Sequence, residues 1–180
     1  MDALLTGTPA AVRTEEILTL LFELAVETND MAGAHTWCTE RRRLYPNGMA
    51  TGDCALTLLA LSPEPDAASA WRVAARVDRA GNRRVPSHLD LATALVLAGA
   101  GLADSAEVLV RRAYAAADPT DADLLLREAR VRVLLRQYAR AGELLDEYVG
   151  GRATHRRWVY DSRWFRPLRS GGDRPRAAEY

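Results

Sequence analysis

Small residues recur along the chain at nearly regular intervals, and this spacing limits the possible fold more than any other feature. Ala34, Ala68, Ala106 and Ala141 lie 34, 38 and 35 residues apart, each near the start of a segment with helical periodicity. Intervals of this length are typical of tandem helical hairpins, in which a small residue lets two helices approach closely. The sequence therefore predicts a repeat array of paired helices.

Turn-forming residues divide the chain into eight expected helices. Asn29–Asp30 and Gly99–Gly101 are typical turn sequences, and Asp66 is suited to cap the helix that follows it. No segment shows the polar and apolar alternation of a half-buried strand. In the first expected helix, one apolar face is shared by Ile17, Leu18, Leu21, Leu24 and Ala25. The four expected pairs are 14–27 with 31–44, 53–61 with 67–80, 87 or 90 to 98 with 104–117, and 120 or 121 to about 136 with 138–149.

The expected domain organisation has three parts. Residues 1–152 are predicted to form the four hairpins, which stack because one hairpin cannot bury its apolar face alone. Residues 153–170 are predicted to cap the apolar end of the array. That segment is rich in aromatic residues, namely Trp158, Tyr160, Trp164 and Phe165. Residues 171–180 are predicted to be a flexible tail.

Several stretches resemble the tetratricopeptide repeat (TPR) family. Residues 101–106 and 138–141 resemble its turn into the second helix, and residues 160–169 resemble the last segment of such arrays in bacterial signalling and regulatory proteins. The first repeat matches the consensus spacing at Leu18, Leu21, Met31, Ala34, Cys38 and Pro46. The resemblance implies a right-handed α-α superhelix and a bacterial protein that binds other proteins through a concave face. Glu128 and Arg132 depart from the pattern, because they stand at positions that are normally apolar.

Composition restricts the environment in which we expect the protein to act. A hydrophobic fraction of 48% and a formal net charge of zero are typical of a folded chain and do not favour an electrostatic nucleic-acid binder. No apolar run is long enough to span a membrane, and the chain shows no secretory signal pattern. We interpret Cys38 and Cys54 as reduced thiols in the core. These features predict a cytoplasmic protein that has no membrane contact.

Residues that could carry chemistry form no recognisable catalytic or metal-binding pattern. His35 and Cys38 are three residues apart, but zinc sites usually need four ligands and no second pair is present. Gly99–Gly101 joins two expected helices, whereas a nucleotide-binding glycine loop follows a strand. We therefore expect no catalytic residue, no metal and no cofactor, and we predict that the protein is not an enzyme.

The charged faces of two expected helices are the candidate binding residues. The inward surface of the first helix should carry Glu16, Thr19, Glu23 and Glu27, and that of the seventh should carry Asp123, Arg127 and Arg130. A groove that runs from acidic to basic could orient a peptide or protein partner. The alternative is that these faces are solvated and held by pairs within a helix, such as Glu128 with Arg132. Arg41–Arg43 could contact phosphates, but a cationic helix end explains them as well, and we do not expect nucleic acid as a partner.

Two functions follow from this pattern. The first is a non-catalytic scaffold or regulatory module that presents a concave helical groove, with apolar residues such as Leu20 or Leu126 exposed between the charges. The second is a sensory module that binds a small ligand or acts in transcriptional control. An enclosed pocket between hairpins would favour the sensory module.

Overall fold

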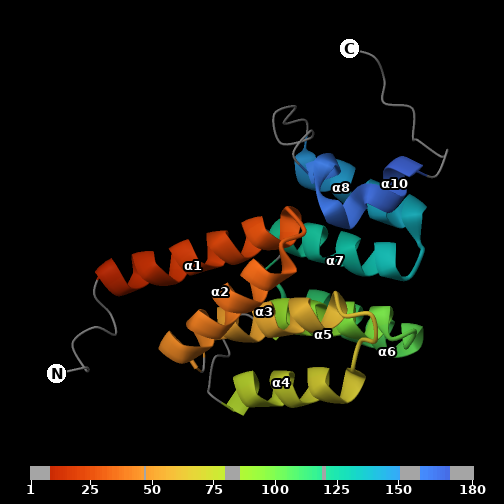
Figure 1. Ribbon diagram of the computed structural model, residues 1–180. Coiled ribbons are helices and arrows are strands. Elements are labelled where there is room, and N and C mark those ends of the chain that lie inside the picture. The colour runs from red at the N-terminus through yellow and green to blue at the C-terminus, as the bar shows by residue number, and fades with distance from the viewer. Residues whose placement is uncertain (1–8, 47, 80–85, 119–120, 151–158, 171–180) are drawn as a thin grey trace.

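Helices follow one another along the chain and pack in consecutive pairs, α1 on α2, α3 on α4, α5 on α6 and α7 on α8 (Figure 1). The computed structural model describes residues 9–46, 48–79, 86–118, 121–150 and 159–170. All regular elements in these ranges are helical, which confirms the predicted all-α class. Their bounds are α1 Pro9–Glu27, α2 Met31–Leu44, α3 Met49–Ala60, α4 Ala67–Arg79, α5 Pro86–Gly99, α6 Ala103–Ala116, α7 Asp123–Leu134, α8 Tyr138–Val149, the 3-10 helix η1 Arg163–Phe165 and α10 Arg166–Ser170.

A periodic backbone contact marks the start of the second helix in every pair. The residues just before α2, α4, α6 and α8 are 36, 36 and 35 residues apart, and the carbonyl of each accepts the N–H of an alanine four residues later. The pairs are Asp30 with Ala34, Asp66 with Ala70, Leu102 with Ala106, and Gln137 with Ala141, and all four alanines are fully buried. The predicted alignment is wrong at Ala68, which is exposed, because Ala70 occupies the equivalent position.

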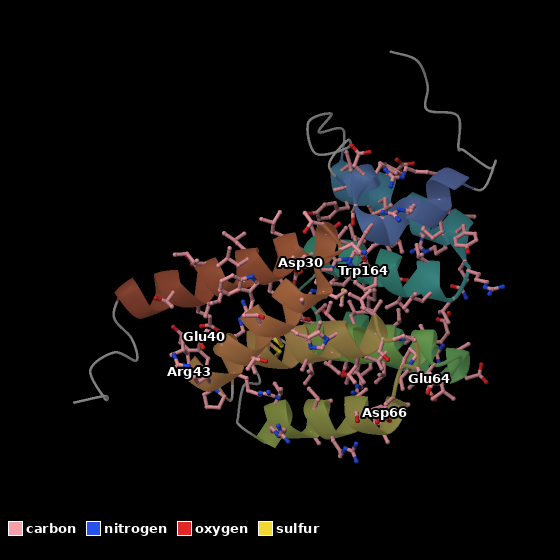
Figure 2. The ribbon with its side chains drawn as sticks, viewed as in Figure 1. Asp30, Glu40, Arg43, Glu64, Asp66 and Trp164 are labelled. Atoms are coloured by element: carbon pink, nitrogen blue, oxygen red, sulfur yellow. A yellow bond between two sulfur atoms is a disulfide. The ribbon has the colours of Figure 1, made fainter. Side chains whose placement is uncertain are left out.

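Three of the four turns within pairs have the same backbone conformation. Asn29, Gly101 and Arg136 have φ values of 62°, 77° and 59°. The residue after each donates its N–H to the carbonyl five residues earlier, which is the usual way of ending a helix with a left-handed residue. The α3–α4 connection differs, because it runs through prolines and ends at Asp66, whose carboxylate accepts the N–H of Ser69 at the start of α4 (Figure 2).

The first helices of the last three pairs form the centre of the molecule. α3 packs on α5 and α5 packs on α7, and residues 89–98 of α5 are all buried. α1 and α4 lie on opposite sides of this layer (Figure 1). The apolar face predicted for α1 is only partly buried: Leu18 and Ala25 are inside, whereas Ile17 and Leu24 are exposed. The close packing partner of α1 is α2, so only a narrow apolar stripe of α1 is covered.

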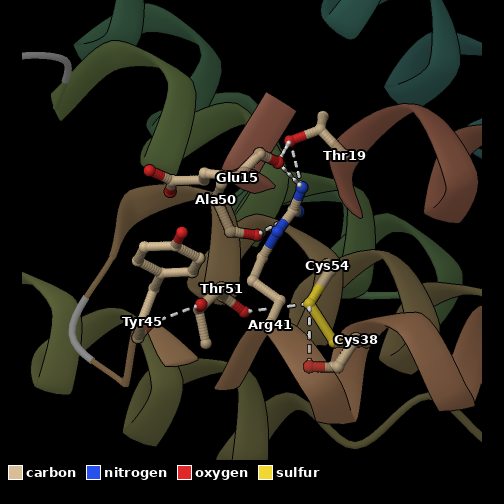
Figure 3. The surroundings of a disulfide bond; sticks show 8 residues. All are labelled: Glu15, Thr19, Cys38, Arg41, Tyr45, Ala50, Thr51 and Cys54. Atoms are coloured by element: carbon tan, nitrogen blue, oxygen red, sulfur yellow. Dashed lines mark hydrogen bonds between the residues drawn. A yellow bond between two sulfur atoms is a disulfide. The ribbon is translucent and has the colours of Figure 1, made fainter. Parts of the chain in front are cut away.

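A disulfide bond between Cys38 and Cys54 joins α2 to α3 (Figure 3). The two Cα atoms are 5.7 Å apart, and both residues are buried. The prediction of two reduced thiols is therefore wrong. The sequence showed two cysteines at apolar positions, but it did not show that the turn before α3 brings the two helices together. The bond also removes Cys38 as a thiolate ligand for a metal.

The C-terminal segment connects the last helix pair to the first. Trp164 and Phe165 are buried, η1 contacts α7, and α10 contacts α8. On the α1 side, the Glu27 carboxylate accepts the Ser162 hydroxyl at 2.9 Å and the Arg163 N–H at 3.0 Å. The described part of the segment thus packs on α7 and α8 and also fastens the end of α1, while the capping of the array by residues 153–170 stays a prediction. The predicted tail 171–180 and the residues near Trp158 lie outside the described residues.

None of the helices in the described ranges has the length and apolar character that a membrane crossing requires.

We predict that reduction of the disulfide lowers the free energy of unfolding by about 3 kcal/mol, the value typical of a bond that closes a loop of this length. Urea denaturation with and without a phosphine reductant measures the change. The Cys38→Ala/Cys54→Ala double variant is the control and should not respond to the reductant. Equal midpoints for the oxidised and reduced native protein would contradict the prediction.

Candidate functional site

A cavity of about 320 Å³ lies between α1 and the layer formed by α3, α5 and α7. Its size is at the lower end of the range for small-molecule sites. Charged residues and apolar surface share its walls. α1 contributes Glu15, Thr19, Phe22, Glu23, Val26 and Glu27, α3 contributes Met49, Ala50, Asp53 and Thr57, and the remaining lining residues are Arg41, His88, Arg127, Arg130 and Trp164.

Most of the predicted binding residues line this cavity. They are Thr19, Glu23, Glu27, Arg127 and Arg130, whereas Glu16 and Asp123 are exposed outside its lining. Their arrangement differs from the expected one. The acidic face of α1 and the basic face of α7 lie on opposite walls of one cavity and do not follow one another along a groove.

Asp53 and Arg127 form a bidentate ion pair between α3 and α7. The guanidinium donates to the carboxylate at 2.6 and 3.2 Å, and about a quarter of each side chain is exposed. Burial alone would raise the pKa of Asp53, but the charge and hydrogen bonds of Arg127, with the charge of Arg130, lower it below its ordinary value. The charge of Arg127 is therefore already matched by a carboxylate of the protein.

Arg41 is almost completely buried, at 2% exposure, and fastens α1 to α2 and α3 (Figure 3). Its guanidinium donates to the carbonyl of Ala50 at 3.0 Å, to the carbonyl of Glu15 at 3.4 Å and to the Thr19 hydroxyl oxygen. Burial lowers the pKa of Arg41 against the opposing charges of Glu15 and Asp53. Arg41 thus uses its terminal NH groups to bind neutral oxygens that hold the cavity wall together, while its buried Nε has no acceptor among the described residues.

Arg130 is the cavity-lining arginine that has no hydrogen-bond acceptor for any of its guanidinium groups among the described residues, whereas Arg41 lacks one only at Nε. It makes no hydrogen bond or ion pair with any described residue, and its Nε is buried. The guanidinium lies over the Trp164 ring, 5.5 Å from the centroid, in a cation–π contact. Burial, together with the like charge of Arg127, lowers the pKa of Arg130. A guanidinium in this setting is well suited to receive an anion.

Glu23 is the corresponding anion on the opposite wall. Its carboxylate has no hydrogen bond or ion pair with any described residue. Burial raises the pKa of Glu23, and the charge of Arg130 reduces this effect without reversing it. Glu23 is therefore available to a ligand, whereas Glu27 is already engaged with η1 and His88 lies 2.7 Å from the carboxylate of Asp121.

Sequence reasoning missed Arg41 and Asp53. Arg41 was interpreted as part of a solvated basic helix end, since its two neighbours Arg42 and Arg43 are indeed exposed. Asp53 carried no signal beyond its place near the start of an expected helix. Trp164 was expected in the cap. Its contact with Arg130 arises because η1 packs on α7, and local periodicity does not predict contacts between distant segments.

This geometry is suited to binding a charged molecule. Among the described residues, no three side chains of His, Cys, Asp or Glu converge as metal ligands. Comparisons with protein-family models, with curated proteins and with solved structures find no match for the chain. The predictions that the protein is not an enzyme and uses no cofactor stay predictions.

We predict that Asp53→Asn lowers the free energy of unfolding by about 2–3 kcal/mol at neutral pH, because it leaves Arg127 without its carboxylate. The contribution of Asp53 is present above the ordinary pKa of an aspartate and is lost as the pH falls through the lowered pKa of the folded state. The difference from the native protein should therefore shrink in acid. Urea denaturation over a pH series measures it, and adding Arg127→Met should restore part of the loss. A difference that is independent of pH would contradict the prediction.

We predict that Glu23→Gln stabilises the protein at neutral pH. The raised pKa means that the carboxylate is disfavoured in the folded state, and this penalty disappears as the pH falls through that pKa and the group is protonated. The gain should be well below about 1 kcal/mol, since Glu23 is an exposed residue and solvent screens its charge. Thermal unfolding at pH 7 and near pH 4 measures it. Lower stability of the variant at pH 7 would contradict the expectation.

Proposed function

We propose that this protein is a non-catalytic regulatory module in which a TPR-like array of four helical hairpins holds a small charged ligand in the cavity between α1 and α7. The period of 36, 36 and 35 residues and the stacking of α3, α5 and α7 support the repeat architecture. In such an array the first helices of the pairs line the concave face, and α1, α3, α5 and α7 all contribute to this cavity.

The observation that carries the proposal is the state of Arg130. Arg130 lines the cavity and makes no hydrogen bond with any described residue, and burial of such a guanidinium costs free energy that a bound anion offsets. By contrast, the terminal groups of Arg127 bind Asp53 and those of Arg41 bind neutral oxygens, although the Nε of Arg41 also lacks an acceptor among the described residues.

The position of the C-terminal segment favours a small ligand over an extended peptide. Trp164 and Glu27 line the cavity where η1 meets the end of α1, and Glu27 is bound to η1. A peptide passing along the concave face would have to displace this contact. A compact molecule that enters beside α1 does not.

The test is a thermal-shift screen of the native protein with a panel of small organic anions, cations and zwitterions at millimolar concentration. We expect at least one compound to raise the melting temperature, because a ligand that binds the folded state stabilises it. The shift should be lost in Arg130→Gln and kept in Arg76→Gln, which changes an exposed arginine of α4. A screen without any shift that depends on Arg130 would overturn the proposal.

A second candidate, a scaffold that binds a protein, is favoured by the outer face of α1. Ile17, Leu20 and Leu24 are 54%, 64% and 60% exposed and lie at helical spacing on one side. Leu126, by contrast, is half-buried against the core. Leu20→Glu should abolish capture of a specific protein partner, whereas Val108→Glu, at an exposed site on α6, should not. Equal capture by both variants would remove the α1 face from consideration.

Cytoplasmic location stays a prediction, and the disulfide removes one of its premises, since such bonds are typical of oxidising compartments.

A further inference from the structure

We infer that the ligand of the cavity is a small zwitterion, a molecule that carries one carboxylate and one ammonium group, such as an amino acid with an apolar side chain. This inference rests on the proposed function and specifies the chemistry of the ligand. Some charged groups of the cavity already have partners in the protein, and others have none. The inference follows from the chemistry of the groups without partners and from the charges around them.

A carboxylate fits Arg130. The planar guanidinium presents parallel N–H donors that match the two oxygens of a carboxylate. Its stacking on Trp164 holds the plane in place, so little freedom is lost when an anion binds. Arg127, the neighbouring cation on α7, is held by Asp53 and adds favourable charge without competing for the same oxygens.

A highly charged anion does not fit. The carboxylates of Glu15, Glu23 and Asp53 line the same cavity and would repel a phosphate dianion. The lining holds three arginines and four acidic residues, so its formal charge is close to neutral. A ligand with no net charge and two separated charged groups is the best match to such a surface.

An ammonium group fits Glu23. This residue is exposed on α1, lines the same cavity as Arg130 of α7, and has no protein donor among the described residues. The two groups do not form an ion pair with each other, and a ligand with both charges can bridge them. Glu23 is disfavoured as a free anion in this position, and a bound ammonium group removes that cost.

The rest of the cavity accommodates an apolar side chain. Phe22 and Val26 of α1 and Met49 of α3 also line the cavity and supply apolar surface. A volume of about 320 Å³ is sufficient for a single amino acid and leaves little room for a longer peptide. We therefore expect amino acids with aliphatic or aromatic side chains to bind best.

The experiment is isothermal titration of the native protein with a matched set of three probes. L-leucine carries both charges, 4-methylpentanoate lacks the ammonium group, and 3-methylbutylamine lacks the carboxylate. L-methionine and L-phenylalanine serve as further zwitterions. We expect a zwitterion to bind at least about tenfold more tightly than its two singly charged analogues, since each analogue leaves one charged group of the cavity without a partner.

Two substitutions connect the binding to the proposed contacts. Arg130→Gln should weaken the zwitterion at least about tenfold, and Arg130→Lys, which keeps the charge but loses the planar fork, should recover part of the affinity. Glu23→Gln should also weaken binding while the ligand-free protein becomes more stable. This opposite change separates a lost ligand contact from a damaged fold. Arg76→Gln is the control and should bind normally.

The outcomes separate this inference from the proposed function. If 4-methylpentanoate binds as tightly as leucine, or if the earlier screen yields an Arg130-dependent ligand that is not a zwitterion, the inference is overturned and the ligand-binding function stands. If no compound in either experiment binds through Arg130, both are overturned.

Discussion

The charged groups of the cavity separate α1 from α3 and α7. The position of α1 therefore depends on hydrogen bonds and a disulfide at a few places. Arg41 links α1 to α2 and α3, and the disulfide links α2 to α3 (Figure 3). Glu27 links the end of α1 to η1. Between these points, the space that apolar side chains would fill in an ordinary helix interface is lined by carboxylates and guanidinium groups. The cavity remains because closing it would bury these charges in a less polar environment.

The three arginines of the cavity, Arg41, Arg127 and Arg130, differ in their partners. This difference separates arginines that stabilise the fold from the one proposed to bind a ligand. Arg127 has a carboxylate and Arg41 has neutral oxygens, so both stabilise the walls. Arg130 and Glu23 have no hydrogen bond with a described residue, and the pKa of each is shifted in the direction that disfavours its charge, as is the pKa of Arg41. Such perturbed charges cluster at functional sites, and the two without hydrogen-bond partners are the ones open to a ligand.

Local signals were enough to place the helices but not to arrange them. The turn sequences at Asn29 and Gly101 correctly predicted which helices are joined as pairs, since short-range backbone preferences determine such turns. The repeat alignment failed at Ala68, because α4 begins with several alanines and the sequence does not show that Ala70 takes the position equivalent to Ala34. The charged faces of α1 and α7 followed from helical periodicity, yet their meeting across one cavity depends on contacts between distant parts of the chain. The same holds for the disulfide and for the pair of Asp53 with Arg127.

The pattern of α1 explains why the sequence suggested a wider buried face than the structure has. Its inner side must stay polar at Thr19, Glu23 and Glu27, and its outer side carries Ile17, Leu20 and Leu24 without a packing partner among the described residues. Only the stripe with Leu18, Phe22, Ala25 and Val26 is left to pack. A stripe this narrow fixes the position of a helix poorly, since apolar contacts have little directional preference. The hydrogen bonds of Arg41 and Glu27 supply that direction, and so the distance between the walls that carry Glu23 and Arg130 is set by polar contacts at either end of the cavity.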